Sequence, residues 1–203
     1  MKLHYSPKSP FVRKIMVFAY ETGLQDSFDR VRSVVGMLKP NAELMKENPW
    51  NKLPTLVTDD GQVLYDSDVI MEYLDTLHDG PKLFLADGSR WKVLRWQSCG
   101  SEMLNALILW RNERERAPEK QLPELMEVFE LKLNTALSML EAEADDLTNT
   151  AFSVGHIAIG CGLGYIDYRF SHIHWQPDHP KLATWYESFK ARPSAQQTEP
   201  QDG

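Results

Sequence analysis

Residues 48–57 read NPWNKLPTLV, and the proline at position 54 governs the interpretation of this stretch. Pro54 has no backbone N–H, so it is best tolerated where a strand begins, and residues 55–58 are predicted to be that strand. A cis bond before Pro54 would turn the backbone of Leu53 outward, where its N–H and C=O can pair with an extended peptide. Only about 5–6% of X–Pro bonds are cis, so the residues by themselves do not require this geometry.

Around this stretch, the first 78 residues alternate between short strand-like and helix-like segments. Ser9, Pro10 and Gly23 are typical of the cap, first position and end of a helix over residues 10–22. Strands are expected at 2–6, 27–34, 55–58 and 62–65, and further helices at 40–47 and 66–77. The order β-α-β-α-β-β-α predicts a mixed α/β domain with a four-stranded sheet.

The hydrophobic periodicity changes near residue 80, and everything beyond residue 88 is predicted to be helical. Ser89 is expected to cap a long helix that runs towards Arg114, and further helices are predicted at 122–144, 153–170 and 181–191. The glycines at 155, 160, 162 and 164 fit a central helix with close neighbours, because each would weaken an exposed helix by about 1 kcal/mol. The predicted domains are therefore 1–78 and 89–203, joined by a linker at 79–88.

Composition excludes several classes of protein. The 203 residues carry a net charge of −7, so there is no general electrostatic reason to bind nucleic acid or an anionic membrane. The start of the chain has no apolar signal region and the longest apolar run, 106–110, is too short to span a bilayer, so a cytoplasmic location is expected. Cys99 and Cys161 form no CxxC pair or metal-ligand spacing, so reduced thiols and no metal are expected.

Two helix starts carry hydroxyl groups with possible chemical roles. Ser9 lies where a strand passes into a helix N-terminus, and a hydroxyl there could donate to a bound thiol and lower its pKa. Its simpler role is to cap the helix. Asp66 and Ser67 begin another helix, where they could recognise an amino-acid head group or merely cap. Lys39 and Lys52 are candidate cations for a carboxylate, although surface lysines are usually only solvated.

Three motifs in this order resemble the glutathione site of the cytosolic glutathione transferases: Ser-Pro-Phe at 9–11, Asn-Pro-x-x-Lys-x-Pro at 48–54, and Asp-Ser-x-x-Ile-x-x-Tyr-Leu at 66–74. The likeness extends over nearly the whole chain, and the start is similar to uncharacterised bacterial transferase-like proteins. It implies a thioredoxin-like N-terminal domain followed by a helical bundle of the transferase type. It also implies glutathione as co-substrate and a homodimer, while the acidic charge and the short apolar runs predict no nucleic-acid or membrane partner.

The resemblance assigns roles position by position. Ser9 matches the thiol-activating serine, and Tyr5, near the end of the first strand, is the rival activator. Leu53 matches the residue whose backbone pairs with the cysteinyl part of glutathione, and Pro54 matches the cis-proline that sets this geometry. The remaining matches concern the two ends of the tripeptide: Asp66 and Ser67 for the γ-glutamyl end, and Lys52, with Lys39 as a further candidate, for the glycyl carboxylate.

The sequence departs from the family pattern at two places. Many members begin the central helix with Ser/Thr-x-x-Asp, whereas residues 153–156 read Ser-Val-Gly-His here, so Ser153 is expected to cap without a reciprocal partner. Trp50 and Asn51 replace a small residue and a glycine. Trp50 is expected to fill part of the groove or to pack at a subunit contact.

The second substrate is expected between the domains, against the long helix after residue 89. Apolar surface with arginine suits an aromatic or carboxylated electrophile, although Trp110 could equally be core and the arginines a solvated helix face. The candidate residues for this electrophile site are Tyr5, Phe11, Trp110, Arg111 and Arg114. The candidate subunit contacts are Met71, Tyr73 and Trp96.

The predicted function is conjugation of the glutathione thiolate to an electrophilic, apolar or aromatic compound, as in detoxification. Glutathione-dependent reduction of disulfides or dehydroascorbate generally needs a cysteine where Ser9 stands. A non-catalytic module that binds glutathione or a protein, in stress response or regulation, is the alternative. Such a module would keep the contacts of Ser67 and Leu53 but would not shift the pKa of the thiol.

Overall fold

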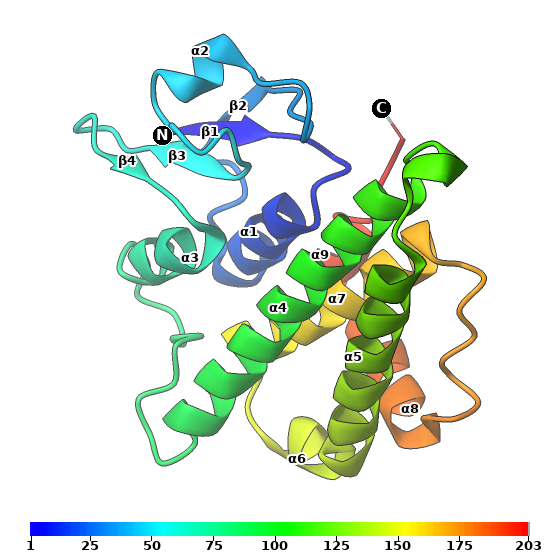
Figure 1. Ribbon diagram of the computed structural model, residues 1–203. Helices are drawn as coiled ribbons and strands as arrows, with labels where there is room; N and C mark the ends of the chain where they lie inside the picture. Colours follow the sequence, from blue (N-terminus) through cyan, green and yellow to red (C-terminus); the bar gives the residue numbers. More distant parts are fainter. Residues whose placement is uncertain (203) are drawn as a thin grey trace. The chain divides into compact units, whose positions relative to one another are not determined.

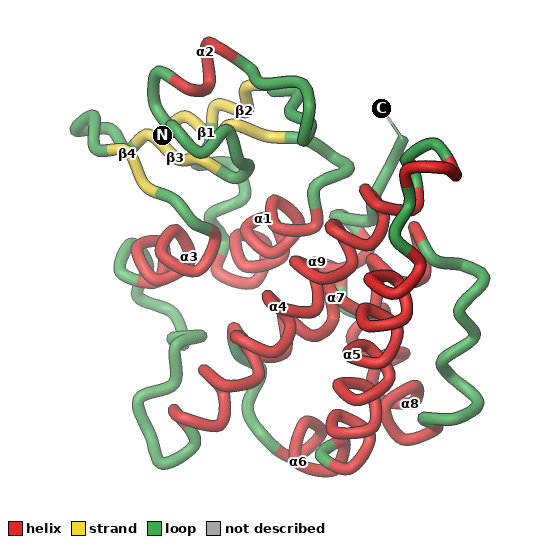
Figure 2. The backbone as a smooth tube through the Cα atoms, viewed as in Figure 1, coloured by secondary structure: helices red, strands yellow, loops and turns green. Residues whose placement is uncertain are grey.

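The computed structural model describes residues 1–202, which form two compact units (Figures 1 and 2). The first unit comprises Met1–Leu85 together with the segment from Pro193 onward, and the second comprises Ala86–Arg192. Of the helices formed by residues 1–202, none has both the length and the apolar character needed to cross a membrane.

The first unit is built on a mixed four-stranded sheet in the order β2-β1-β3-β4. Strand β1 is parallel to β2 and antiparallel to β3, and β4 is antiparallel to β3. This arrangement confirms the predicted fold class and element order. Its elements are β1 (Lys2–Tyr5), α1 (Pro10–Thr22), β2 (Asp29–Arg32), α2 (Ala42–Met45), β3 (Thr55–Val57), β4 (Val63–Leu64), α3 (Ser67–Asp75) and α9 (Pro193–Gln196).

Helix α1 forms where its capping signals predict. Pro10 occupies the first position, and Gly23 ends the helix with a φ of 74°, in the left-handed region that glycine adopts without a steric penalty. Helices α1 and α3 cover one face of the sheet and α2 lies on the other (Figure 1). The core between sheet and helices is fully buried and apolar, and it includes Leu3, Ile15, Phe18, Leu56, Ile70 and Leu74.

The end of the chain belongs to the first unit, whereas the sequence assigned all of residues 89–203 to the helical domain. Pro193 starts the short helix α9, since proline is well tolerated at a first helical position. Helix α9 packs on α1, where Arg13 donates to the carbonyl of Ala195 at 3.4 Å and Ser194 donates to Glu21.

The second unit is entirely helical, with α7 at its centre. Every residue of α7 from Val154 to Ile166 is buried. A Cβ placed on Gly155 would lie 2.8 Å from the carbonyl oxygen of Val93, and one on Gly160 would lie 2.5 Å from the Phe189 ring, which confirms the predicted close approach. The helices are α4 (Arg90–Arg114), η1 (Pro118–Lys120), α5 (Pro123–Ala142), α6 (Ala144–Asn149), α7 (Val154–Arg169) and α8 (Pro180–Lys190).

The expectation that Ser153 caps α7 is wrong. Its hydroxyl lies 2.7 Å from Nδ1 of His156, and Nε2 of His156 lies 2.9 Å from the carbonyl oxygen of Leu147. Because a carbonyl only accepts, Nε2 carries the proton of the neutral ring, and Ser153 must donate to Nδ1. Burial, assisted by the charge of Arg192, lowers the pKa of His156 and so favours this neutral ring.

Two other expectations, on the cap of α4 and on the subunit contacts, are also wrong. Ser89 makes no side-chain cap, because its backbone is already helical and its hydroxyl donates to Asp87 instead. Met71 and Trp96 are fully buried within the chain, so neither can be a surface contact between subunits. Trp96 instead donates its indole N–H to Glu143 at 2.7 Å.

Candidate functional site

Three backbone ends converge in the first unit. His4 near the end of β1 pairs with Thr55, so the residues just before β3 lie beside the point where the chain leaves β1 for α1. Lys14 of α1 contacts Ser67, the first residue of α3. The β1–α1 turn, the entry to β3 and the start of α3 therefore lie close together, which places Ser9, Leu53 and Ser67 in one region of the unit.

Ser9 occupies the cap position of α1. Its hydroxyl oxygen accepts a hydrogen bond from the backbone N–H of Val12 at 3.3 Å, as predicted for a cap. Because the oxygen acts as acceptor in this bond, the hydroxyl proton remains available for a second partner. Ser9 is half-buried, and it lies at the helix end where backbone N–H groups favour negative charge.

The loop before β3 is held by Asn48. Its side-chain amide donates to the carbonyl of Lys52 at 3.3 Å and to Oγ1 of Thr55 at 2.9 Å, and its Oδ1 accepts from the N–H of Trp50 at 3.0 Å. Asn51 has a φ of 54°, a left-handed conformation that asparagine tolerates better than other side chains except glycine. This explains how asparagine stands where the family more often has glycine.

Leu53 presents an unpaired stretch of main chain at the end of this loop. The Leu53–Pro54 peptide bond is cis, the geometry that the resemblance implied. The Leu53 side chain is buried, whereas within residues 1–202 its backbone N–H and C=O make no hydrogen bond. Since main-chain groups generally find partners, this pair of groups is suited to an extended peptide laid alongside.

The start of α3 combines a cap with a buried hydroxyl. Oδ1 of Asp66 accepts from the backbone N–H of Asp68 at 3.0 Å, so Asp66 is the cap. Ser67 is buried, and its hydroxyl oxygen lies 3.2 Å from Nζ of Lys14. An ammonium can only donate, so Ser67 accepts from Lys14 and keeps its own proton for another acceptor.

Lys14 is a member of this site that the sequence interpretation missed. Its side chain is 0% exposed and its ammonium pairs with Asp68 as well as contacting Ser67. A signal was present in the sequence: position 14 lies four residues before Phe18, on the apolar face of α1, and a lysine there needs a buried acidic partner. Lys14 places a positive charge behind Ser67, which suits recognition of a carboxylate by that hydroxyl.

Lys39 and Lys52 are both exposed, and in residues 1–202 neither ammonium has an acidic partner. Lys52 belongs to the loop that Asn48 organises, next to Leu53. Lys39 lies in a turn closed by hydrogen bonds with Gly36. Both cations are therefore available to an anionic ligand, as the sequence suggested, although their contacts within the chain do not fix them in place.

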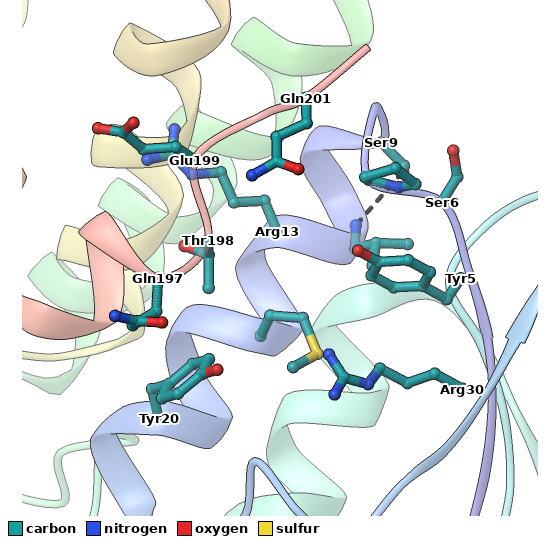
Figure 3. A pocket seen from close by; sticks show the side chains of 13 residues that line it. Tyr5, Ser6, Ser9, Arg13, Tyr20, Arg30, Gln197, Thr198, Glu199 and Gln201 are labelled. Atoms are coloured by element: carbon teal, nitrogen blue, oxygen red, sulfur yellow. Dashed lines mark hydrogen bonds between the residues drawn. The ribbon is translucent and has the colours of Figure 1, made fainter. Parts of the chain in front are cut away.

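A cavity of about 240 Å³ opens beside Ser9 (Figure 3). Tyr5 and Ser9, the two rival thiol activators, both line it. The other lining residues come from the β1–α1 turn, α1, β2 and the end of the chain: Ser6, Pro7, Val12, Arg13, Met16, Tyr20, Arg30, Gln197, Thr198, Glu199 and Gln201.

The electrophile candidates on α4 make contacts within the helical unit. Trp110 is buried, stacks on Phe129 with ring centres 6.5 Å apart, and borders an apolar cavity of about 270 Å³ between α4 and α5. Arg111 donates to the hydroxyl of Tyr165 at 3.0 Å, and Arg114 donates to the carbonyl of Arg169 at 2.9 Å. These contacts match the core role that the sequence left open for Trp110.

The remaining candidate groups are inert in this arrangement. Burial raises the pKa of the Cys99 thiol, and Cys161 is fully buried. Neither cysteine is therefore a favourable nucleophile. Across residues 1–202, no three His, Cys, Asp or Glu side chains gather as a metal ion would require.

Phe11, the last electrophile candidate, lies near Lys14, with the ammonium 5.6 Å from the ring centre.

Comparison with known proteins identifies the family. Residues 8–77 match the glutathione S-transferase N-terminal domain, and residues 114–188 match the glutathione S-transferase C-terminal domain. The chain is 31% identical to the uncharacterised GST-like protein YibF of Escherichia coli K12, over 98% of each chain.

Solved structures agree with the sequence comparison. A glutathione transferase family member from Pseudomonas fluorescens Pf-5 with bound glutathione is 40% identical, with a TM-score of 0.95 and 99% of each chain covered. A structure from the same organism with bound S-(propanoic acid)-glutathione is 38% identical, with a TM-score of 0.91 over 100% of each chain. A glutathione S-transferase from Methylobacillus flagellatus KT with glutathione bound is 31% identical, with a TM-score of 0.87, and covers 98% of this chain and 99% of its own.

The two family models, the curated relative and the solved structures agree: the chain belongs to the glutathione S-transferase family.

Proposed function

We propose that this protein conjugates glutathione to electrophilic carbon compounds. The observation that carries the proposal is the combination, in one unit, of unpaired main-chain groups at Leu53 and a hydroxyl at Ser9 whose oxygen accepts but whose proton is free. The relatives with bound glutathione, and the one with glutathione substituted on its sulfur, support the same ligand here.

Glutathione would lie as an extended strand beside the entry to β3. Its cysteinyl main chain would pair with the N–H and C=O of Leu53, which Pro54 and the Asn48 contacts hold in place. Ser67 would donate to the γ-glutamyl carboxylate while it accepts from Lys14, and Asp66 would take the ammonium. Lys52 and Lys39 would meet the glycyl carboxylate.

The chemical step follows from the position of Ser9. Its O–H would donate to the glutathione sulfur, and the N-terminus of α1 would add favourable electrostatics, so the thiol pKa falls and more thiolate is present at neutral pH. The thiolate then attacks an electrophilic carbon, and the thiol proton goes to solvent. In a substitution the C–S bond forms as the leaving group departs with its electron pair; in an addition to an activated alkene the C–S bond forms, the π bond breaks, and the resulting carbanion takes a proton from solvent. Tyr5 lines the same cavity and is the alternative hydrogen-bond donor.

The electrophile site, the location in the cell and the oligomeric state are also part of the proposed function. Phe11, Trp110, Arg111 and Arg114 remain the proposed residues for an apolar or aromatic electrophile. We place the activity in the cytoplasm because neither Cys99 nor Cys161 forms a disulfide, and we assign it to detoxification from the family alone. A homodimer is proposed from the family alone.

One observation favours a second candidate, a module that binds glutathione without turning it over. The oxygen of Ser9 already caps α1, so its contribution could be structural only. The two candidates separate in a calorimetric titration with reduced glutathione at neutral pH, followed by a conjugation assay with chloronitroarenes and activated alkenes. We expect binding and turnover, and we expect Ser67→Ala to weaken binding about tenfold, since a hydrogen bond to a charged group contributes roughly 1.5–3 kcal/mol.

Ser138→Ala is the matched control, because Ser138 lies on α5 and donates only to the carbonyl of Asn134. Its affinity for glutathione should equal that of the wild type. Tight binding without turnover on any electrophile would favour the module, and no association with glutathione would contradict both candidates.

A further inference from the structure

We propose that the cavity beside Ser9 is a subsite for a carboxylate carried by the electrophile, with Arg30 and Arg13 as its cations. The inference rests on the proposed function, since it names the class of substrate that the transferase would take. The cavity shares Ser9 and Tyr5 with the thiol site, so a group attached to the glutathione sulfur would extend into it.

Arg13 supplies a buried positive charge with spare hydrogen-bonding capacity. The residue is only 7% exposed, and its Nε is buried without a hydrogen-bond partner. Its bond to the carbonyl of Ala195, at 3.4 Å, leaves most of its five N–H groups unused, and in residues 1–202 it has no acidic partner. A buried guanidinium without a counter-ion is costly, so an anion in the cavity would stabilise it.

Arg30 supplies a second charge from the opposite wall. It lines the cavity from β2, and its side chain runs from that strand towards α1 (Figure 3). The part of the chain that the structure describes gives Arg30 neither an ion pair nor a side-chain hydrogen bond. An exposed arginine with no acidic neighbour can turn its planar donor pair to a carboxylate, the geometry that guanidinium groups match best.

The rest of the lining sets the polarity of the subsite. Glu199 is its one carboxylate and is exposed, so the lining carries two positive charges and one negative charge. Hydroxyl and amide groups complete the polar wall, while Val12 and Met16 give a small apolar surface next to Ser9. The fitting electrophile is therefore a compact one, with an apolar or aromatic body at the sulfur and a carboxylate at its far end.

The reaction for such a substrate balances without any further reactant. With para-chloro-meta-nitrobenzoate, the thiolate attacks the ring carbon that bears chlorine, the C–S bond forms, and chloride leaves with the bonding electron pair. The thiol proton goes to solvent, and the carboxylate is unchanged throughout. The conjugate keeps its carboxylate on the sulfur substituent, where the guanidinium of Arg30 can hold it.

Equilibrium binding of two conjugates tests the subsite without requiring turnover. One is the glutathione conjugate of meta-nitrobenzoate and the other is the conjugate of the corresponding benzamide, which has the same shape but no charge. We expect the wild type to bind the acid about tenfold more tightly, and Arg30→Gln to remove most of that preference, because hydrogen bonds between ionised groups are stronger than those to a neutral amide. Glu199→Gln should act in the opposite direction and raise the preference about twofold.

Lys120→Gln is the control for loss of one positive charge, because Lys120 is exposed and does not line the cavity. It should keep the wild-type preference. Equal binding of acid and amide by the wild type, or a preference that survives in Arg30→Gln, would overturn the subsite. Affinity for glutathione itself is measured in parallel: its loss counts against the proposed function, while intact glutathione affinity without acid preference counts against the subsite alone.

Discussion

The serines at helix starts behave differently in the two units. Ser9 at α1 and Ser67 at α3 use their oxygens as acceptors, from the N–H of Val12 and from the Lys14 ammonium. Ser153 at α7 instead donates its proton to His156. The first two hydroxyls keep a proton for a ligand, whereas the third is used up inside the protein.

This difference shows that the direction of a hydrogen bond decides whether a capping residue can serve chemistry. All three serines look alike in the sequence, since each precedes or begins a helix. Ser9 is half-buried and lines a cavity, whereas Ser153 is fully buried and contacts the imidazole of His156. The account predicts that the Ser153 cluster controls stability and that Ser9 and Ser67 control binding and catalysis.

The largest stability loss is expected for His156→Ala. The change removes a buried ring packed against Trp96 and Trp185 and leaves Ser153 and the carbonyl of Leu147 without their partner. We expect the free energy of unfolding to fall by about 4 kcal/mol, from the cavity and the unsatisfied polar groups together. Urea denaturation measures it, and a loss below about 1 kcal/mol would show that the cluster is not a structural centre.

Lys14→Met tests the charge behind Ser67. It leaves Asp68 without its buried partner, and because Asp68 is partly exposed we expect a loss of about 2–3 kcal/mol in unfolding free energy, at the low end for a broken buried pair. Affinity for glutathione should fall as well, since Ser67 loses its donor. Unfolding and calorimetry measure the two effects. Unchanged glutathione affinity in a folded variant would separate Lys14 from the ligand site.

Ser153→Ala and Ser9→Ala form a matched pair. Ser153→Ala should lower the unfolding free energy by about 2 kcal/mol, because it leaves the buried acceptor Nδ1 of His156 without a hydrogen-bond donor. Ser9→Ala should cost only about 1 kcal/mol, the usual loss of a helix cap. Conjugation rates should show the reverse order, with the activity of folded Ser153→Ala unchanged. Equal losses of activity in the two variants would break the distinction.

The smallest effect is a dependence of stability on pH. Burial lowers the pKa of His156 in the folded protein. Below about pH 6.5 the imidazole therefore becomes protonated in the unfolded chain while it stays neutral in the folded chain. This contribution is complete above that pH and is lost as the pH falls towards the folded pKa, by at most about 1.4 kcal/mol per pH unit. Unfolding free energies of wild type and His156→Leu, compared between neutral and mildly acidic pH, should differ in slope; parallel slopes would exclude His156 as the source.

Local signals were sufficient to predict most of the fold from the sequence. Pro10 and Gly23 predict the start and the end of α1, and Pro54 predicts where β3 begins. The glycines of α7 indicate that neighbouring helices pack closely against it. Local reasoning failed where a partner came from a distant segment. The segment after Pro193 packs on α1 through contacts such as that of Arg13 with Ala195. The sequence around either residue gives no sign of this contact, because the two lie 182 positions apart.

In the candidate site, too, local features could be predicted from the sequence and contacts between distant segments could not. Its backbone features, at Leu53 and at the two helix starts, follow from short motifs and could be predicted. Lys14 could be recognised only by asking what a lysine does on the apolar face of a helix, and its partner Asp68 lies 54 positions away in the sequence. Arg30 carries no motif, because only the fold brings β2 and the end of the chain to one cavity.

The central claim is that the free proton of Ser9 lowers the pKa of the glutathione thiol. A pH titration of bound glutathione, followed by thiolate ultraviolet absorbance, tests it in the wild type, Ser9→Ala and Tyr5→Phe. The account predicts a depressed thiol pKa in the wild type and in Tyr5→Phe, and a value close to that of free glutathione in Ser9→Ala. A pKa unchanged by Ser9→Ala but restored by Tyr5→Phe would contradict it and give the role to Tyr5.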